Sequence, residues 1–199
     1  MSVNRVMQEM SPTVPGFTNP KVLGLLYSVV VQFQPKTCVE IGSFMGRSAS
    51  VISLALAALG GGRRLICVDL FDTKVDQNFV QLPLIREIMK YAESSKGQYC
   101  DLTRISTIGD CFDLTTERFP HMLENVTKIQ CDSASDWNSG RDTFDFSYID
   151  GDHTYEAVKR DALSVMRYAN AGHCMVFDDY STQFPGVVRF VEELKSHQA

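Results

Sequence analysis

The sequence lacks several patterns that assign proteins to large classes. Its six cysteines include no C-x-x-C pair, the spacing that is typical of zinc ribbons and thioredoxin-like redox sites. Four of the cysteines lie in apolar runs, as reduced core thiols do. No uninterrupted apolar run approaches the roughly 20 residues that span a bilayer, and the start has no apolar segment of a signal peptide. We therefore expect a cytoplasmic protein without membrane contacts.

Clusters of positive charge are also missing. The chain has 19 Lys and Arg residues against 24 Asp and Glu, a formal net charge of -5, and its basic residues are scattered. Because binding to a phosphate backbone needs concentrated positive charge, we expect no nucleic-acid partner.

What the sequence does contain is an alternation of apolar strand-like runs with helical segments. With 199 residues and 44% hydrophobic composition, it is expected to form a single domain over residues 1–199. The expected strands are residues 37–41, 64–70, 126–131, 144–149 and 173–177. The expected helices are residues 20–33, 47–59, 155–168 and 186–197. This order predicts an α/β fold with a parallel sheet covered on both faces, whose ligands bind at the carboxyl ends of the strands.

Two stretches fall outside this alternation. Residues 1–19 contain Pro12, Pro15 and Gly16, which predict an irregular N-terminal arm. Residues 72–125 are too long for a simple crossover and include helical stretches near 82–94 and 109–123. We expect this insertion to serve as a lid, a substrate wall or an interface.

The first expected strand runs into a turn with two glycines, Gly42 and Gly46. Gly42 permits a sharp turn, and Gly46 permits a close approach to the backbone where the next helix begins. The dinucleotide fingerprint G-x-G-x-x-G is absent, and Glu40 before the first glycine suits a positively charged ligand without a pyrophosphate. The alternative is that both are ordinary turn glycines.

Polar residues also follow the second and third expected strands. Asp69 and Leu70 end the second strand, where a carboxylate accepts hydrogen bonds from ribose hydroxyls, although a solvated strand-end acid is the alternative. Asp132 and Ser133 follow the third strand and are also ordinary turn formers. Asp69 therefore favours an adenosine-containing ligand without identifying it.

The fourth and fifth expected strands each end in acids. Asp150 follows one and Asp178 the other, and side chains on adjacent strands lie about 4.8 Å apart. Asp179 converges on them if the extended backbone ends at Asp178. Three carboxylates without a His or Cys pair predict an oxygen-preferring divalent cation such as Mg²⁺.

His153 lies three residues beyond Asp150, where a helix begins. The positive end of that helix is expected to lower the pKa of His153 and keep the imidazole neutral, as a general base requires. The alternative is a solvated residue at the helix start, with Asp152 or Thr154 as the cap.

Two motifs in this order resemble a known family. V-E-I-G through G-R-S, residues 39–48, is similar to the first motif of class I S-adenosylmethionine (SAM)-dependent methyltransferases. Y-I-D-G-D-H-T-Y-E, followed by D-D-Y, resembles a metal-dependent group that includes sugar O-methyltransferases, cephalosporin-hydroxylase-like and catechol O-methyltransferase-like proteins. The likeness covers about residues 38–186 and implies a Rossmann-like sheet, SAM as cofactor and a small-molecule hydroxyl as acceptor.

The resemblance also implies roles for individual residues. Asp150, Asp178 and Asp179 match acids that hold the metal, and His153 together with Asp150 is expected to carry catalysis. The residues expected to bind SAM are Glu40, Gly42, Ser43, Gly46, Ser48, Asp69, Leu70, Asp132, Ser133 and Asp150.

The sequence departs from the family at its end. Class I methyltransferases normally continue into two further strands, whereas this sequence stops at Ala199, after the last expected helix. Either the protein is a shortened form or the chain is a fragment, and in both cases we expect a sheet without those strands and an open edge that a second copy or the N-terminal arm covers. Two alternatives stay open: a non-catalytic SAM-binding or assembly module, and an NAD-dependent oxidoreductase, which Glu40 and the missing fingerprint disfavour.

Overall fold

The computed structural model describes residues 14, 16–75 and 105–197 of the chain. Its backbone groups into two compact units, and each is described by itself. The helical unit comprises Met1–Gln34, Phe44–Arg64 and Phe71–Val126, and the sheet unit comprises Pro35–Ser43, Leu65–Leu70 and Thr127–Ala199. The expectation of a single domain stays a prediction.

The helical unit contains α2 (Pro20–Phe33), α3 (Arg47–Leu59), α6 (Ile108–Arg118) and α7 (Pro120–Asn125). The bounds of α2 and α3 agree with the predicted helices, and Asn19 caps α2 by accepting a hydrogen bond from the Lys21 amide at 2.8 Å. The predicted helix at 109–123 is two helices, since Pro120 begins α7. The predicted helix at 82–94 lies outside the described residues, as does most of the N-terminal arm. No helix in the described ranges is long and apolar enough to cross a membrane.

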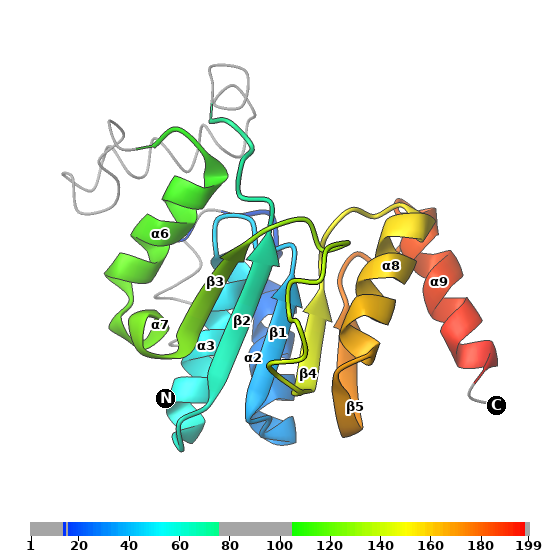
Figure 1. The fold of residues 1–199 in the computed structure, drawn as a ribbon, viewed down its shortest axis with the longest axis horizontal. Helices are drawn as coiled ribbons and strands as arrows, with labels where there is room; N and C mark the ends of the chain where they lie inside the picture. The colour runs from blue at the N-terminus through cyan, green and yellow to red at the C-terminus, as the bar shows by residue number, and fades with distance from the viewer. Residues whose placement is uncertain (1–13, 15, 76–104, 198–199) are drawn as a thin grey trace. The chain divides into compact units, whose positions relative to one another are not determined.

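The sheet unit contains β1 (Thr37–Ile41), β2 (Arg64–Asp69), β3 (Val126–Gln130), β4 (Phe144–Ile149) and β5 (Ala169–Phe177). Their order is β3-β2-β1-β4-β5, and all five arrows point the same way (Figure 1). The predicted α/β fold with a parallel sheet is therefore confirmed. Within the described residues the sheet has five strands, and β5 forms one edge.

The start of β5 was predicted four residues too late. The strand begins at Ala169 rather than His173, and its pairing with β4 is irregular: Ala169 lies opposite Phe144, whereas Cys174 lies opposite Phe146. Gly172 adopts a positive φ of 79° within this irregular stretch. The segment A-N-A-G-H lacks the β-branched residues that indicate strands, so the sequence pattern missed it.

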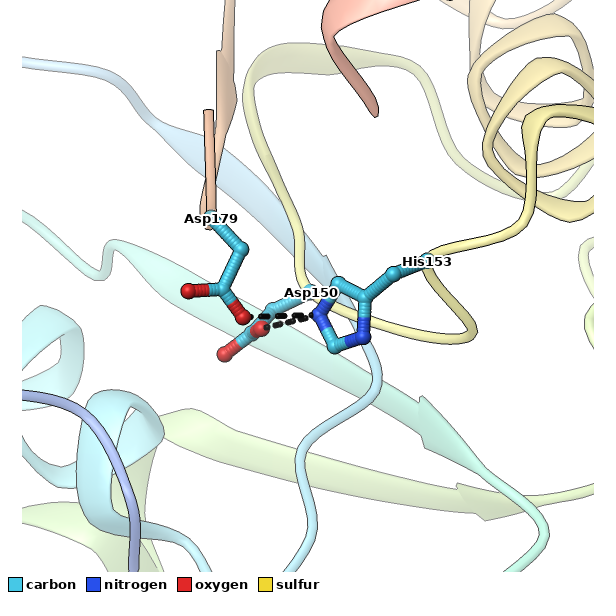
Figure 2. A group of neighbouring side chains, drawn as sticks. All are labelled: Asp150, His153 and Asp179. Carbon is cyan, nitrogen blue, oxygen red and sulfur yellow. Dashed lines mark ion pairs between the residues drawn. The ribbon is translucent and has the colours of Figure 1, made fainter. Parts of the chain in front are cut away.

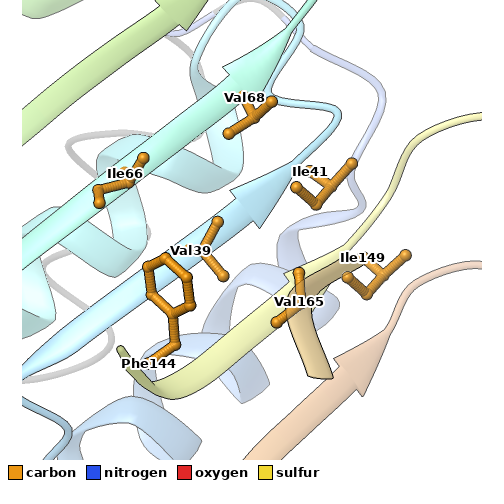
Figure 3. Close-up of a cluster of buried hydrophobic side chains, with 7 residues drawn as sticks. All are labelled: Val39, Ile41, Ile66, Val68, Phe144, Ile149 and Val165. Atoms are coloured by element: carbon orange, nitrogen blue, oxygen red, sulfur yellow. The ribbon is translucent and has the colours of Figure 1, made fainter. Parts of the chain in front are cut away.

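Two helices of the sheet unit pack on the sheet and on each other. Val165 of α8 (Tyr155–Met166) joins a buried cluster with side chains of β1, β2 and β4 (Figure 3). In a second cluster, Val187 and Phe190 of α9 (Pro185–Ser196) pack on Val158 and Ala162 of α8. Burying a large apolar side chain contributes about 1.5–3 kcal/mol, so these clusters fix both helices beside the strands.

Asp145 connects the starts of three strands. Its Oδ2 accepts hydrogen bonds from the Lys36 and Thr37 amides at 2.8 and 3.0 Å, and its Oδ1 accepts one from the Asn170 side chain at 2.7 Å. Burial alone raises the pKa of Asp145, but these hydrogen bonds together outweigh it and lower the pKa below its usual value.

We expect Asp145→Ala to lower the free energy of unfolding by about 1–2 kcal/mol at pH 7, because it removes hydrogen bonds to a charged acceptor at a partly exposed site. The folded-state pKa is depressed, so this stabilisation is present above the unfolded pKa of about 3.9 and is lost as pH falls through the folded pKa. Urea denaturation from pH 7 to pH 3 measures the difference. Glu124→Ala, at an exposed position, is the control, and an equal loss in both variants would contradict the assignment.

Candidate functional site

The carboxyl ends of β1, β4 and β5 meet at one edge of the sheet. Ile41 pairs with Ile149, and Ile149 pairs with Phe177. Beyond these pairs the Asp150 amide donates to the Ile41 carbonyl at 2.9 Å, and the Asp178 amide donates to the Ile149 carbonyl at 3.0 Å. The backbone register therefore places Asp150 beside Asp178, as the sequence predicted.

Gly42 forms the sharp turn that the sequence predicted. Its φ is +87°, and its amide donates to the Val68 carbonyl at 2.9 Å. A Cβ at this position would lie 2.2 Å from the Asp150 carbonyl oxygen and 2.6 Å from the Gly151 nitrogen. Only glycine therefore allows the end of β1 to approach the end of β4 this closely.

Asp150, His153 and Asp179 form a cluster at the same edge. His153 Nε2 lies 2.9 Å from an Asp179 carboxylate oxygen and 3.7 Å from one of Asp150 (Figure 2). Asp179 has a left-handed φ of 54°, so the chain turns directly after β5. Thr154 caps α8, and His153 precedes this cap. Short loops after two neighbouring strands thus bring the three side chains together.

Asp178 lies beside this cluster rather than in it. In the described part of the chain, the group that could hold a metal ion comprises Asp150, His153 and Asp179, whose ligand atoms lie within 4.8 Å of one another. The charge of Asp178 acts on Tyr148, a side chain only 1% exposed. Burial, together with the charges of Asp150 and Asp178, raises the pKa of Tyr148 well above its usual value and keeps the phenol neutral.

The cluster carries more negative charge than its surroundings readily support. Burial is the main cause that raises the pKa of Asp150, to about 7, and the nearby charge of Asp178 adds to it, while the interaction with His153 opposes it. Burial and the charge of Asp178 also raise the pKa of Asp179. A divalent cation relieves such crowding, and carboxylate oxygens are its preferred ligands, so this set of donors fits a metal site.

The expectation of a lowered pKa for His153 is wrong. The interaction with the Asp150 carboxylate and the charge of Asp179 raise the pKa of His153, although partial burial opposes them. Two carboxylates within 4 Å therefore outweigh the positive end of α8. The sequence pattern missed this because it did not show that Asp179 turns toward the imidazole.

Glu40 and Ser43 are both buried where β1 ends. Val39 and Ile41 contribute to the hydrophobic cluster, and Glu40, between them, lies on the opposite face of the strand. Its Oε2 accepts a long hydrogen bond of 3.6 Å from the Cys67 thiol. Burial, and next the charge of Glu40, raise the pKa of Cys67, so this cysteine stays a thiol.

The other predicted positions of the sheet unit lie in the loops after β2 and β3. Asp69 is half-buried at the end of β2, and Leu70 after it is 53% exposed. Asp132 is exposed, and its side chain accepts from the Ala134 amide at 2.8 Å. The structure thus places these positions at the same ends of the strands as Gly42 and Asp150 (Figure 1).

Ser133 has a buried partner that the sequence analysis missed. Its hydroxyl donates to Asp161 Oδ1 at 2.6 Å, and Asp161, in α8, is only 2% exposed. A Cβ on Gly151 would lie 3.0 Å from the other oxygen of the same carboxylate. Asp161 therefore lies against the loops after both β3 and β4. The only signal of this in the sequence was that Asp161 follows Ala157 by one helical turn.

The two remaining predicted residues belong to the helical unit. Gly46 precedes α3 with a φ of 90°, and a Cβ there would lie 3.1 Å from the Phe112 ring. Ser48, in the first turn of α3, is 4% exposed. The close approach at Gly46 is thus to a phenyl ring of its own unit, and a ligand contact at either residue stays a prediction.

Comparison with known proteins identifies the class. The methyltransferase domain family matches residues 39–180, most of the chain, and the chain therefore belongs to this family and is an enzyme of the methyltransferase class. This assignment favours the methyltransferase interpretation over the dehydrogenase and over the non-catalytic module. No curated protein matches the chain.

Solved structures of methyltransferases share the fold. The methyltransferase PaMTH1 of Podospora anserina, bound to S-adenosylhomocysteine (SAH), has 10% identity and a TM-score of 0.56 over 98% of this chain and 78% of its own. A putative caffeoyl-CoA O-methyltransferase from Staphylococcus aureus has 15% identity and a TM-score of 0.54 over 98% and 82%. The Bacillus cereus O-methyltransferase in complex with SAH has 16% identity and a TM-score of 0.51 over 98% and 77%. The predicted Rossmann-like class I fold is confirmed.

We expect Gly42→Ala to lower the free energy of unfolding by about 3 kcal/mol or more, because the new Cβ meets the Asp150 carbonyl in addition to the strained φ. Gly61→Ala is the matched control, since Gly61 has a similar φ of +78° but nothing within 4 Å of the position that the new methyl group would take. Its cost is expected at about 1 kcal/mol. Equal losses in the free energy of unfolding for the two variants, measured by chemical denaturation, would show that the close approach to Asp150 does not contribute to the cost of the Gly42 substitution.

Proposed function

We propose that the protein transfers the methyl group of SAM to a hydroxyl oxygen of a small molecule, assisted by a divalent cation. The observation that carries the proposal is the cluster of Asp150, His153 and Asp179 at the sheet edge formed by the Gly42 turn. The similar structures support the methyl donor and the oxygen acceptor: two are named as O-methyltransferases and two are bound to SAH.

SAM fits the acidic edge of the sheet because its sulfonium carries a positive charge. We assign the backbone at Gly42 and Ser43, with the carboxylates of Glu40 and Asp150, to the methionine and sulfonium part of the ligand. Asp69 is placed to accept hydrogen bonds from the ribose, with Leu70 beside it. The loop with Asp132 and Ser133 takes the adenine. Gly46 and Ser48 remain expected contacts from the sequence motif.

The cation is assigned to Asp150 and Asp179, with Asp178 as the third acidic group. A divalent cation held there would supply Lewis-acid chemistry, orienting the acceptor hydroxyl and lowering its pKa. The carboxylates of Asp150 and Asp179, from two neighbouring loops, point toward each other and would hold the ion (Figure 2).

His153 is assigned as the general base. The acceptor oxygen attacks the methyl carbon of SAM, the carbon–sulfur bond breaks to give SAH, and the hydroxyl proton passes to His153 Nδ1. In the neutral ring Nε2 carries the proton, because it lies 2.9 Å from a carboxylate oxygen of Asp179 and 3.7 Å from one of Asp150, and both carboxylates stabilise the imidazolium that forms. The raised pKa of His153 reflects the same interaction.

Substitution Asp150→Asn is expected to abolish Mg²⁺-dependent methyl transfer while the affinity for SAH, which lacks the sulfonium charge, changes by less than about fivefold, because the variant removes a metal ligand and keeps the shape of the turn. Release of SAH with a panel of catechol and sugar acceptors measures turnover, and calorimetry with SAH measures cofactor binding. Asp152→Asn, two residues away and exposed, is the matched control. Full Mg²⁺-dependent activity in Asp150→Asn would rule out the metal role.

For His153→Gln we expect kcat to fall about a hundredfold or more, with the affinities for SAH and Mg²⁺ retained, because only the proton acceptor is lost. Steady-state kinetics and calorimetry with Mg²⁺ separate this role from ligation. A variant that loses Mg²⁺ affinity and regains activity at high Mg²⁺ would identify His153 as a metal ligand instead of a base.

A further inference from the structure

The segment between β5 and α9 folds back onto the loop that carries His153. After Asp179, the Ser181 amide donates to the Asp179 carbonyl at 2.7 Å, and the Phe184 amide donates to the Ser181 carbonyl at 3.0 Å. These two turns lead directly to Phe184, Pro185 and Gly186, where α9 begins. The start of α9 is thus tied to the same strand end that delivers Asp179.

Gly186 lies against the backbone of the His153 loop. A Cβ on Gly186 would lie 2.4 Å from the His153 carbonyl oxygen, 2.4 Å from the Tyr155 nitrogen and 2.8 Å from the Thr154 carbonyl carbon. All three are backbone atoms, which cannot move aside as the tip of a flexible side chain can. Glycine is therefore required for α9 to approach this loop so closely.

Phe184 makes the matching contact with the side chain of His153. The centroids of the two rings lie 4.4 Å apart, with an angle of 40° between their planes. The imidazole therefore has the Phe184 ring on one side and the two carboxylates at Nε2. Carboxylates alone fix one ring nitrogen, whereas the aromatic contact also limits rotation of the ring.

We infer that Phe184 and Gly186 are positioning residues that hold His153 against Asp150 and Asp179, a role that rests on the proposed function of His153. The packing of α9 on α8 through Val187 and Phe190 holds the start of α9 in place. The chain of contacts runs from this hydrophobic cluster through the first turn of α9 to the imidazole. None of these residues touches the reacting atoms.

The test compares Gly186→Ala and Phe184→Leu with Leu194→Ala. Helix propensity favours Ala over Gly, so a loss in Gly186→Ala reports the contact with the loop. We expect kcat to fall about tenfold or more in the first two variants with the KM for SAM unchanged within about twofold, since small displacements of a catalytic group reduce turnover strongly. Phe184→Tyr keeps the ring and is expected to retain activity.

Leu194→Ala is the control for a general loosening of α9. Leu194 lies in the last turn of α9 and packs against the cluster with α8, so this variant lowers the thermal midpoint at a distance from the His153 loop. We expect its kcat to match that of the wild type after correction for the folded fraction. An equal fall in kcat for Leu194→Ala would overturn the positioning role.

A second readout is independent of activity. The imidazole signals of His153, assigned by comparison with His153→Gln in proton–carbon NMR spectra at fixed pH, are expected to shift in Gly186→Ala and Phe184→Leu but not in Leu194→Ala. If the wild type transfers no methyl group, the proposed function fails and these signals still decide the positioning role. Unchanged signals in both folded variants would overturn it, and Phe184→Leu serves alone if Gly186→Ala does not fold.

Discussion

The site depends on one backbone constraint, the close approach of Gly42 to Asp150. Parallel pairing of β1 and β4 ends at Ile41 and Ile149. Beyond these residues the two backbone segments are in contact, with no side chain between them. Any residue with a Cβ would push the loop after β4 away from the sheet. Because Asp150 and His153 both lie on this loop, the turn at Gly42 sets where the acids and the imidazole stand.

The charges at this edge of the sheet then determine which ligands it can bind. Glu40, Asp150, Asp178 and Asp179 bring negative charge to a partly buried region, and each adds to the cost of charging Asp150 or Tyr148. A sulfonium and a divalent cation both reduce this cost, so one arrangement of acids favours both proposed ligands. The same charges make His153 a stronger base than its place before a helix suggests.

Much of the fold was predictable because strands and helices carry local signals. The bounds of β1 and β4 agree with the predicted ranges, since both are short runs rich in β-branched or aromatic residues, and α2 follows from Asn19 and Pro20. The first half of β5 was not predictable, because its irregular pairing depends on β4 rather than on its own residues. Local patterns therefore identified the elements, and tertiary pairing determined the exceptions.

The candidate site was predictable in its residue types but not in its contacts. The acids at two strand ends indicated Asp150 and Asp179, and a turn after Asp178 was the stated condition for Asp179 to join them, but its contact with the His153 imidazole was not predicted. The sequence also did not specify Ser133 as the partner of Asp161 or the contact of Gly186 with the His153 loop, since each pair is distant along the chain. Such contacts depend on the packing of α8 and α9, which residue patterns do not specify.

The central claim is that one edge of the sheet binds both a methyl donor and a cation. The most direct measurement is a crystal structure of the protein grown with SAH and Mn²⁺, with the metal located by anomalous scattering. The account predicts an anomalous peak about 2 Å from carboxylate oxygens of Asp150 and Asp179, with SAH against the Gly42 turn. SAH bound elsewhere, or a metal peak away from these carboxylates, would contradict it.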